Sequence, residues 1–345
     1  MALGKLFGML SSDIAIDLGT ANTLVYKKQG GIIINEPSVV AMTADGKKVV
    51  CIGQKAKEML GKNPDEVRVV QPIKDGVIAD FRVTELMLNS LIMRSQKNRW
   101  LIRPRVIICV PSGITEVEKR AVRDSALHAG AREVHLVSEP VAAAIGADLP
   151  IHKPYGNMIM DIGGGTSEIA VISLSHIVVH NSIRLGGDRL DLDIMNYLKK
   201  KNNIYVGIQT AEKIKMAIGN IYPLKQELEM DVRGRDIQTG YPVTIKVTSG
   251  EIREALSETI SSMIDAVKRL FEKTSPELAA DIAERGIVLT GGGALLRGLD
   301  EKIKEVVDLP VHVVPEPLVA IVKGCGKILD NIEDYKEVLI KKTEE

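Results

Sequence analysis

Two short glycine runs, 144 residues apart, constrain this chain more than any other feature. Residues 17–23 read Asp-Leu-Gly-Thr-Ala-Asn-Thr, and residues 161–167 read Asp-Ile-Gly-Gly-Gly-Thr-Ser. Each run lies between two apolar stretches, which predicts a strand, a tight turn and a second strand in both places. Because the spacing is about one domain, we interpret the repeat as an internal duplication. Two similar halves would then face each other across a ligand cleft.

The composition excludes several classes of protein. The 345 residues suit two domains, and Lys plus Arg equals Asp plus Glu at 45 each. A net charge of zero argues against a nucleic-acid-binding protein. Three cysteines far apart, without a Cys-x-x-Cys pair, argue against a disulfide framework and favour a reducing compartment. His176 and His180 lie in an alternating, strand-like stretch, so their spacing does not favour a metal site.

The periodicity predicts strands that alternate with helices, as an α/β fold requires. Thr115 has the character of an N-cap with acidic residues after it, and Gly130 has that of a helix stop. The predicted strands include 105–110, 134–137 and 287–290. The predicted helices cover 115–130, 140–147, 210–218, 249–273 and 294–307.

The glycine turns are suited to holding phosphate. Only glycine lets backbone N–H groups approach phosphate oxygens without a Cβ in the way, and successive amides form a concave nest for an anion. Gly19 and Thr20 would do this in the first half, and Gly163 to Thr166 in the second. An aspartate beside a triphosphate would repel it unless a divalent cation lay between them. Asp17 and Asp161 are therefore predicted Mg²⁺ site residues, acting directly or through waters. The alternative is that both turns are merely tight hairpins.

A third glycine loop follows the predicted strand 287–290. Residues 290–296 read Thr-Gly-Gly-Gly-Ala-Leu-Leu, a strand–loop–helix pattern that can contact a nucleotide. The loop does not match G-x-G-x-x-G, because residue 296 is Leu, and the chain contains no G-x-x-x-x-G-K-[ST]. A dinucleotide-binding fold and a P-loop enzyme are both disfavoured.

Taken together, these runs resemble the superfamily of actin, sugar kinases and heat-shock ATPases, and within it the MreB family of bacterial actin-like proteins. The stretches that carry the resemblance run from residue 13 to about residue 300. They are AIDLGTANTLVY, NEPSVVA, PIKDGVIADF, CVPSGIT, SEPVAAAIGA, DIGGGTSEIAV, RLGGDRLD, AEKIK, VRGRD and RGIVLTGGGALLRGL. The individual loops occur throughout the superfamily, whereas the ordered set is specific to the family.

The resemblance implies an ATP site and assigns its residues. Glu139 would orient or activate the attacking water, with Thr166 helping to hold it. The alternative for Glu139 is a charge that only starts a helix. Asn22 stands near the place where actin has a lysine, which leaves open which cation contacts the phosphates. The implied ATP-binding residues are Gly19, Thr20, Ala21, Asn22, Gly163, Gly164, Gly165 and Thr166 at the phosphates, Glu212, Lys213, Ile214 and Lys215 at the ribose and base edge, and Gly291, Gly292, Gly293, Ala294 and Leu295 at the adenosine.

Two segments are predicted to contact a membrane surface. Leu3, Leu6, Phe7 and Leu10 form one stripe of a helix, which favours an amphipathic leader over residues 1–12. Trp100 and Leu101 lie between arginines in a loop where MreB proteins carry a small hydrophobic loop, a pattern suited to anionic lipid. The alternative in both cases is a segment that packs on the protein's own body. No run approaches the length of a transmembrane helix.

The resemblance implies an actin-like α/β fold of two duplicated ribonuclease-H-like halves. The first half would comprise 13–150 plus about 318–345, with a small subdomain over about 33–70. The second would comprise 151–317, with a small subdomain over about 185–247. The implied function is a slow Mg²⁺-dependent ATPase that polymerises at the inner face of the cell membrane and organises cell-wall synthesis with shape-determining membrane proteins. A chaperone ATPase of the DnaK type and a small-molecule kinase are the alternatives.

Overall fold

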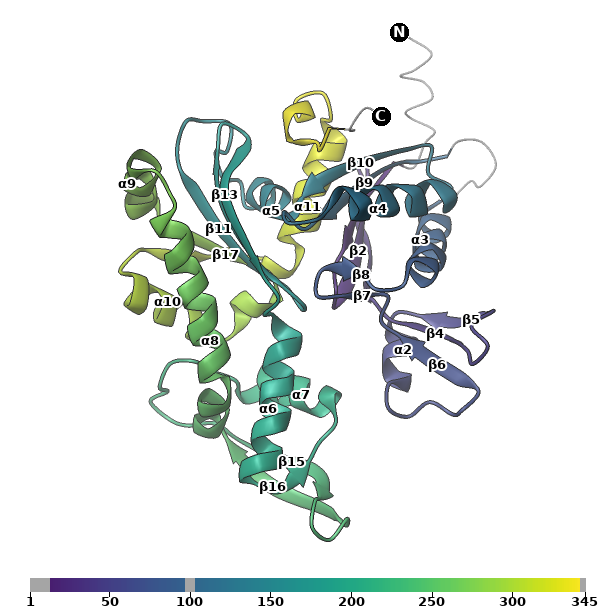
Figure 1. The fold of residues 1–345 in the computed structure, drawn as a ribbon, viewed down its shortest axis with the longest axis vertical. Coiled ribbons are helices and arrows are strands. Elements are labelled where there is room, and N and C mark those ends of the chain that lie inside the picture. The colour runs from purple at the N-terminus through teal and green to yellow at the C-terminus, as the bar shows by residue number, and fades with distance from the viewer. Residues whose placement is uncertain (1–12, 97–102, 342–345) are drawn as a thin grey trace.

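The computed structural model describes residues 13–96 and 103–341. The predicted membrane residues Leu3, Leu6, Phe7, Leu10, Trp100 and Leu101 lie outside the described residues. Figure 1 shows two α/β lobes side by side, each extended downward by a smaller unit. Within the described ranges, none of the helices combines the length and apolarity needed to cross a membrane.

The two lobes are built on five-stranded sheets of the same design. The first sheet has the order β10-β9-β1-β2-β3, and the second has the order β13-β12-β11-β17-β18. In each, the first strand of the lobe pairs antiparallel with the next strand and parallel with a later one. The strands are β1 (Ile14–Leu18), β2 (Asn22–Lys27), β3 (Gly31–Pro37), β9 (Arg105–Val110), β10 (Glu133–Ser138), β11 (Asn157–Ile162), β12 (Ser167–Ser173), β13 (His176–Ile183), β17 (Ile287–Thr290) and β18 (Val311–Val313).

The register makes the two glycine runs equivalent. Asp17 lies opposite Leu24 on the antiparallel neighbour and Cys109 on the parallel one. Asp161 lies opposite Glu168 and Thr290 in the same way. Each aspartate is the last but one residue of its strand, directly before the turn. The predicted duplication and the predicted strand–turn–strand units are therefore confirmed.

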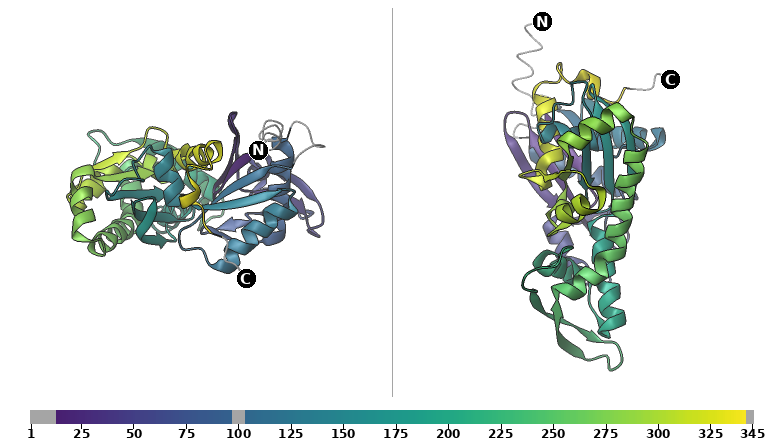
Figure 2. Two further views of the ribbon diagram at one scale, coloured as in Figure 1. Left: turned by 90° about the horizontal axis from the view of Figure 1, so that it is seen from above. Right: turned by 90° about the vertical axis from the view of Figure 1, so that its left-hand side faces the viewer.

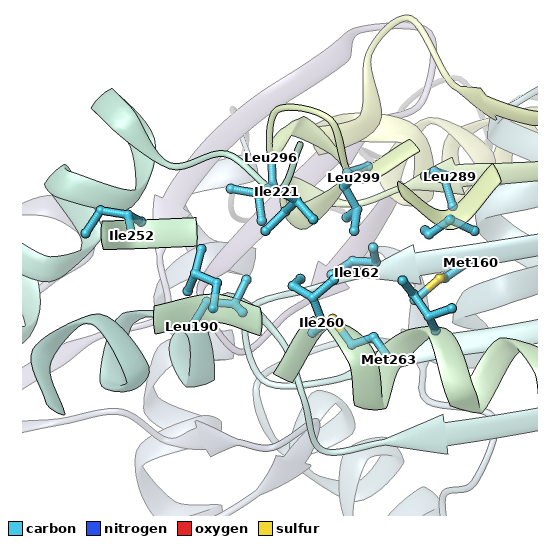
Figure 3. Packing of buried hydrophobic residues seen from close by; sticks show 14 of the residues in the cluster. Met160, Ile162, Leu190, Ile221, Ile252, Ile260, Met263, Leu289, Leu296 and Leu299 are labelled. Atoms are coloured by element: carbon cyan, nitrogen blue, oxygen red, sulfur yellow. The ribbon is translucent and has the colours of Figure 1, made fainter. Parts of the chain in front are cut away.

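Helices cover the outer face of each sheet. In the first lobe these are α3 (Phe81–Ser95) and α4 (Glu116–His128), and α4 begins with the predicted cap, since Thr115 and Glu118 form a reciprocal capping box. In the second lobe they are α8 (Ser249–Glu272), α9 (Pro276–Arg285) and α10 (Leu299–Val307), while α6 (Gly187–Lys201) and α7 (Ile208–Ile218) lie lower, beside β15 (Glu229–Asp236) and β16 (Pro242–Thr248) (Figure 1). Figure 3 shows how Ile260 and Met263 of α8 pack against Met160 and Ile162 of the sheet.

Two helices lie between the lobes, α5 (Glu139–Gly146) and α11 (Ala320–Asp330). Seen from above, α11 separates the blue first lobe from the green second lobe (Figure 2). Their core cluster includes Ala15 and Ile107 of the first sheet and Ile159 and Ala170 of the second. The inner faces of the two sheets are thus directed toward one another across these helices. The predicted domain limits at residues 150 and 318 stay a prediction.

Each lobe carries a smaller sheet. In the first, β4 (Val40–Thr43) pairs with β5 (Val49–Ile52) and β6 (Val67–Val70) beside α2 (Gln54–Met59). In the second, β15 (Glu229–Asp236) pairs with β14 (Ile204–Tyr205) and β16 (Pro242–Thr248). A short hairpin of β7 (Ile73–Lys74) and β8 (Val77–Ile78) connects the first small sheet to α3. The 3-10 turns are η1 (Gly292–Leu295), η2 (Pro317–Val319) and η3 (Lys336–Val338).

The prediction of one helix over 294–307 is wrong. The chain forms the 3-10 turn η1, becomes extended at Leu296 and starts α10 only at Leu299. Gly298 adopts a left-handed conformation with φ of 72°, which glycine adopts without steric cost. The interruption has a tertiary cause, because Ile221 N donates to Arg297 O at 2.8 Å. A continuous helix would lose that pairing.

Candidate nucleotide site

The two predicted phosphate turns lie in contact with each other at the ends of β1 and β11. A Cβ placed on Gly164 would lie 2.6 Å from the Cβ of Ala21. One placed on Gly165 would lie 2.8 Å from Thr20 Oγ1. Neither position tolerates a side chain, so glycine is what allows the turns to meet. Residues from both halves therefore meet at one place, and their binding of phosphate stays a prediction.

The β7–β8 hairpin closes one side of this site. Its turn residues Asp75 and Gly76 both have positive φ, 51° and 75°, as the mirror-image turns of two-residue hairpins require. Gly76 N donates to Thr20 Oγ1 at 3.1 Å. A Cβ on Gly76 would lie 3.0 Å from Thr166 Cγ2. The hairpin thus rests on both turns. Sequence reasoning gave it no role, although the Asp-Gly pair marks such a turn.

The second turn is hydrogen-bonded to the start of helix α6. Gly187 N donates to Gly163 O at 2.9 Å, and Asp188 N donates to Gly164 O at 2.8 Å. These two N–H groups at the amino end of α6 are therefore occupied by carbonyl oxygens of the turn, so they fix the position of the turn. Lys215 Nζ lies 2.8 Å from both Gly187 O and Asp191 Oδ1. Lys215, one of the predicted nucleotide residues, is thereby held at the start of α6, next to the second predicted phosphate turn.

The remaining predicted residues of α7 are spread over different surroundings. Glu212 forms an ion pair of 2.8 Å with Lys57 of α2, so it bridges the two small units. Gln209, one turn earlier, donates to Lys57 O at 2.7 Å. Lys213 is exposed, and Ile214 is fully buried in the core of the second lobe. Their contact with nucleotide stays a prediction, and the bridge to Lys57 had no signal in the sequence.

The third glycine loop packs against the end of β11. Gly291 has φ of 81°, and a Cβ there would lie 2.7 Å from Asp161 Oδ1. A Cβ on Gly293 would lie 2.2 Å from Ile162 Cγ2. Gly292 lies beside Leu318, Ala294 is buried, and Leu295 is exposed. The structure thus places this loop next to the second phosphate turn and its aspartate.

Four buried carboxyl groups gather on the inner faces of the sheets. They are Asp17 and Asp161 before the turns, Glu139 at the first position of α5, and Glu168 on β12. Burial raises the pKa of Asp17 to about 6, while a hydrogen bond from Cys109 Sγ (3.2 Å) acts the other way. Burial and the charges of Asp17 and Glu168 raise the pKa of Asp161 to about 8. Burial and the charges of its neighbours, first Glu168, hold the pKa of Glu139 well above its ordinary value.

This cluster fits a hydrated divalent cation. Asp161 Oδ1 and Glu168 Oε1 are buried without a hydrogen-bond partner in the described part of the chain. Residues 13–96 and 103–341 contain no group of three or more His, Cys, Asp or Glu side chains placed to hold a metal. Mg²⁺ commonly takes only one or two carboxylates and completes its shell with phosphates and waters. Acidic oxygens beside the two predicted phosphate turns match that chemistry.

Glu168 and Ser112 were given no individual role by sequence reasoning. Ser112, in the loop after β9, donates to Glu168 Oε2 from its backbone N (3.2 Å) and from its Oγ. The bond connects the first half to the second. The available signal was a glutamate directly before the apolar run 169–172 of the strand Ser167–Ser173. Burying a carboxylate in a strand costs free energy, so a glutamate at such a position indicates a specific interaction.

A family model described as MreB/Mbl protein matches residues 11–337 of the chain. The cell shape-determining protein MreB of Escherichia coli (strain K12) is 50% identical over 336 residues, which is 96% of this chain and 97% of the relative.

Two solved structures of MreB5 of Spiroplasma citri are similar over 95% of this chain and 98% of theirs, each with a TM-score of 0.90. The one bound to ADP is 37% identical and the one bound to AMPPNP is 38% identical. A chain of the MamK double helical filament matches with a TM-score of 0.77 at 22% identity, over 92% of this chain and 98% of that one, which shows the fold alone.

Proposed function

Because the chain belongs to the MreB/Mbl family, we propose that it is an ATP-dependent, filament-forming cell-shape protein. ATP binds between the two halves, and its slow Mg²⁺-dependent hydrolysis is coupled to polymerisation. The observation that carries the proposal is the contact between Gly164–Gly165 of one half and Thr20–Ala21 of the other, beside four buried carboxyl groups. The ADP and AMPPNP complexes of the Spiroplasma citri relative support it.

The proposed residue roles follow from the geometry of the site. The turn amides from Gly19 to Asn22 and from Gly164 to Thr166 bind the phosphates. Gly163 N closes the second turn by donating to Thr166 O at 2.9 Å, and the amino end of α6 holds that turn in place. Asp17 and Asp161 would hold Mg²⁺ through waters, and the bound cation would supply positive charge to the phosphates. Glu139 lies at the same inner face and orients the water that attacks the γ-phosphorus. As the water oxygen bonds to phosphorus, the bond to the β–γ bridging oxygen breaks and ADP leaves with the electron pair. The proton of the water passes to the carboxylate of Glu139 or to the phosphate that forms.

The cellular part of the proposal rests on the relatives. The Escherichia coli relative is named a cell shape-determining protein, and an assembly role for the shared fold is illustrated by the MamK filament. We propose that this chain likewise forms open, head-to-tail polymers and organises cell-wall synthesis to maintain a rod shape. Its partners would be further copies of itself, the inner membrane surface and shape-determining membrane proteins. The leader and the Trp100 loop would make it a peripheral protein at the cytoplasmic face.

Phosphate release measured against protein concentration tests this proposal. The rate per molecule should rise above a critical concentration, because neighbouring subunits complete a slow site. Glu139→Gln should lower the rate by about 10²-fold or more, with ATP affinity nearly unchanged. A rate that ignores protein concentration and responds to a sugar or an organic acid would support a small-molecule kinase instead.

A further inference from the structure

Glu168 is the one member of the carboxyl cluster that the proposed chemistry leaves without a role. It is 0% exposed. The duplication gives a direct comparison, because its register position opposite Asp161 corresponds to that of Leu24 opposite Asp17. The same scaffold therefore accommodates an apolar residue in one half and a carboxylate in the other. Stability alone favours the apolar residue, since a buried carboxylate is costly without an ideal partner.

The position of Glu168 on β12 directs it to the inter-lobe face. Ala170 and Ile172 of the same strand belong to the core cluster between the sheets, whereas Ile169 and Val171 belong to the core of the second lobe. Side chains alternate along a strand, so Glu168 shares the face of Ala170 and Ile172. Asp161 shares the face of Ile159, which belongs to the same inter-lobe cluster. The charge of Glu168 acts on both Glu139 and Asp161.

The two oxygens of Glu168 have different surroundings. Oε2 accepts two hydrogen bonds from Ser112, one from the backbone N at 3.2 Å and one from Oγ. Oε1 is buried and has no hydrogen-bond partner among the described residues. A carboxylate fixed at one oxygen and free at the other is suited to accept a hydrogen bond from a molecule that enters the site. Since the fixing residue belongs to the opposite half, the orientation of Glu168 depends on how the halves close.

We propose that Glu168 is a positioning residue for hydrolysis: Ser112 fixes Oε2, and Oε1 accepts a hydrogen bond from the water that Glu139 orients toward the γ-phosphate. The inference rests on the proposed ATPase function. It implies that closure of the two halves directly changes how the attacking water is held. Holding that water with two acceptors restricts its orientation, which is the kind of constraint that raises a rate without tightening substrate binding.

The test compares variants of the full chain by phosphate release at saturating ATP, ATP affinity and thermal unfolding. Glu168→Leu copies the residue at the corresponding position of the first half. We expect it to unfold at the same or a higher temperature, to bind ATP within about twofold of the wild type, and to lose about 10²-fold in kcat. Glu168→Gln keeps an acceptor for Ser112 and should lose less. Ser112→Ala should lower kcat in the same direction, and combining it with Glu168→Leu should add little further loss.

Ser173→Ala, at the far end of the same buried strand, is the matched control and should retain the wild-type kcat. If Glu168→Leu keeps the wild-type kcat, or loses it only in proportion to ATP affinity or folding, the inference is overturned and Glu168 serves only to connect the halves. A wild-type chain that releases no phosphate at any concentration overturns the proposed function itself. The two failures are therefore distinguishable.

Discussion

At the scale of single residues, the site collects groups that oppose the stability of the empty protein. Asp17, Asp161 and Glu139 are each buried, and burial raises the pKa of all three. Folding must remove these carboxyl groups from water, and none of them forms an ion pair with a cationic side chain in residues 13–96 and 103–341. Bound phosphates and a divalent cation would reverse that balance. The carboxyl cluster is thus better explained by the proposed ligands than by the stability of the fold.

The aspartate of the second turn gives a pH-dependent prediction. The pKa of Asp161 is about 8 in the folded chain against an ordinary 3.8, so the folded state retains a proton that the unfolded state has lost. Stability should therefore fall as pH rises through this window. In magnesium-free buffer, Asp161→Asn should raise the unfolding temperature by a few degrees at pH 8 and by much less at pH 5. Scanning calorimetry measures this, with the exposed Asp65→Asn as control. An equal effect at both pH values would contradict the assignment.

The roles of single residues could be predicted from the sequence where neighbouring residues form a recognisable motif. The glycines and aspartates of the two turns are local, so their spacing sufficed to place them in one site. Lys57 and Glu212 are 155 residues apart and meet only because the two small units approach each other. Ser112 and Glu168 meet for the same kind of reason. No local pattern encodes such pairs.

At the scale of elements, the decisive contact is the crossing of α5 and α11 between the sheets. A Cβ on Gly146 would lie 1.9 Å from Ala320 O, and one on Gly324 would lie 1.8 Å from Ala142 O. The two helix backbones therefore touch, and each glycine makes room for the other helix. Sequence periodicity found α5 but could not find this crossing. It also missed the break at residues 296–298, because pairing with Ile221 overrides local helix preference there.

Gly324→Ala should force the two central helices apart. A methyl group that close to a backbone carbonyl cannot be accommodated by a rotamer change, so we expect a loss of about 3 kcal/mol or more in the free energy of unfolding. Denaturant unfolding measures it. Gly250→Ala in α8, where the nearest atom to the new Cβ lies at 3.6 Å, is the matched control and should change stability by less than about 1 kcal/mol. Equal stabilities of the two variants would show that the helices do not cross as described.

At the scale of the whole molecule, the two halves are connected at both ends of the inter-lobe face. The helices α5 and α11 join them at one end, and the contacts of Lys57 with Glu212 and Gln209 join the small units at the other. The ion pair is about one-third exposed on each side, so it contributes at most about 1 kcal/mol. Such a contact biases closure without locking it.

Lys57→Ala should therefore speed the release of bound ADP by about two- to fivefold, the range that a loss of up to about 1 kcal/mol allows. Displacement of a fluorescent ADP analogue by excess ADP gives the rate. Lys55→Ala, an exposed lysine on the same helix, controls for the change of charge. Identical release from both variants would mean that the contact between the small units does not govern access to the site.

We propose that ATP held between the halves drives assembly on a membrane. The most direct measurement is negative-stain electron microscopy of the purified chain on a lipid monolayer, with Mg-ATP, with Mg-ADP and without nucleotide. We predict ordered filaments on the lipid with Mg-ATP, and fewer or none in the other two conditions. Dispersed monomers under all three conditions, while ATP hydrolysis persists, would contradict ATP-driven assembly and leave a chaperone or a small-molecule kinase as the function of this chain.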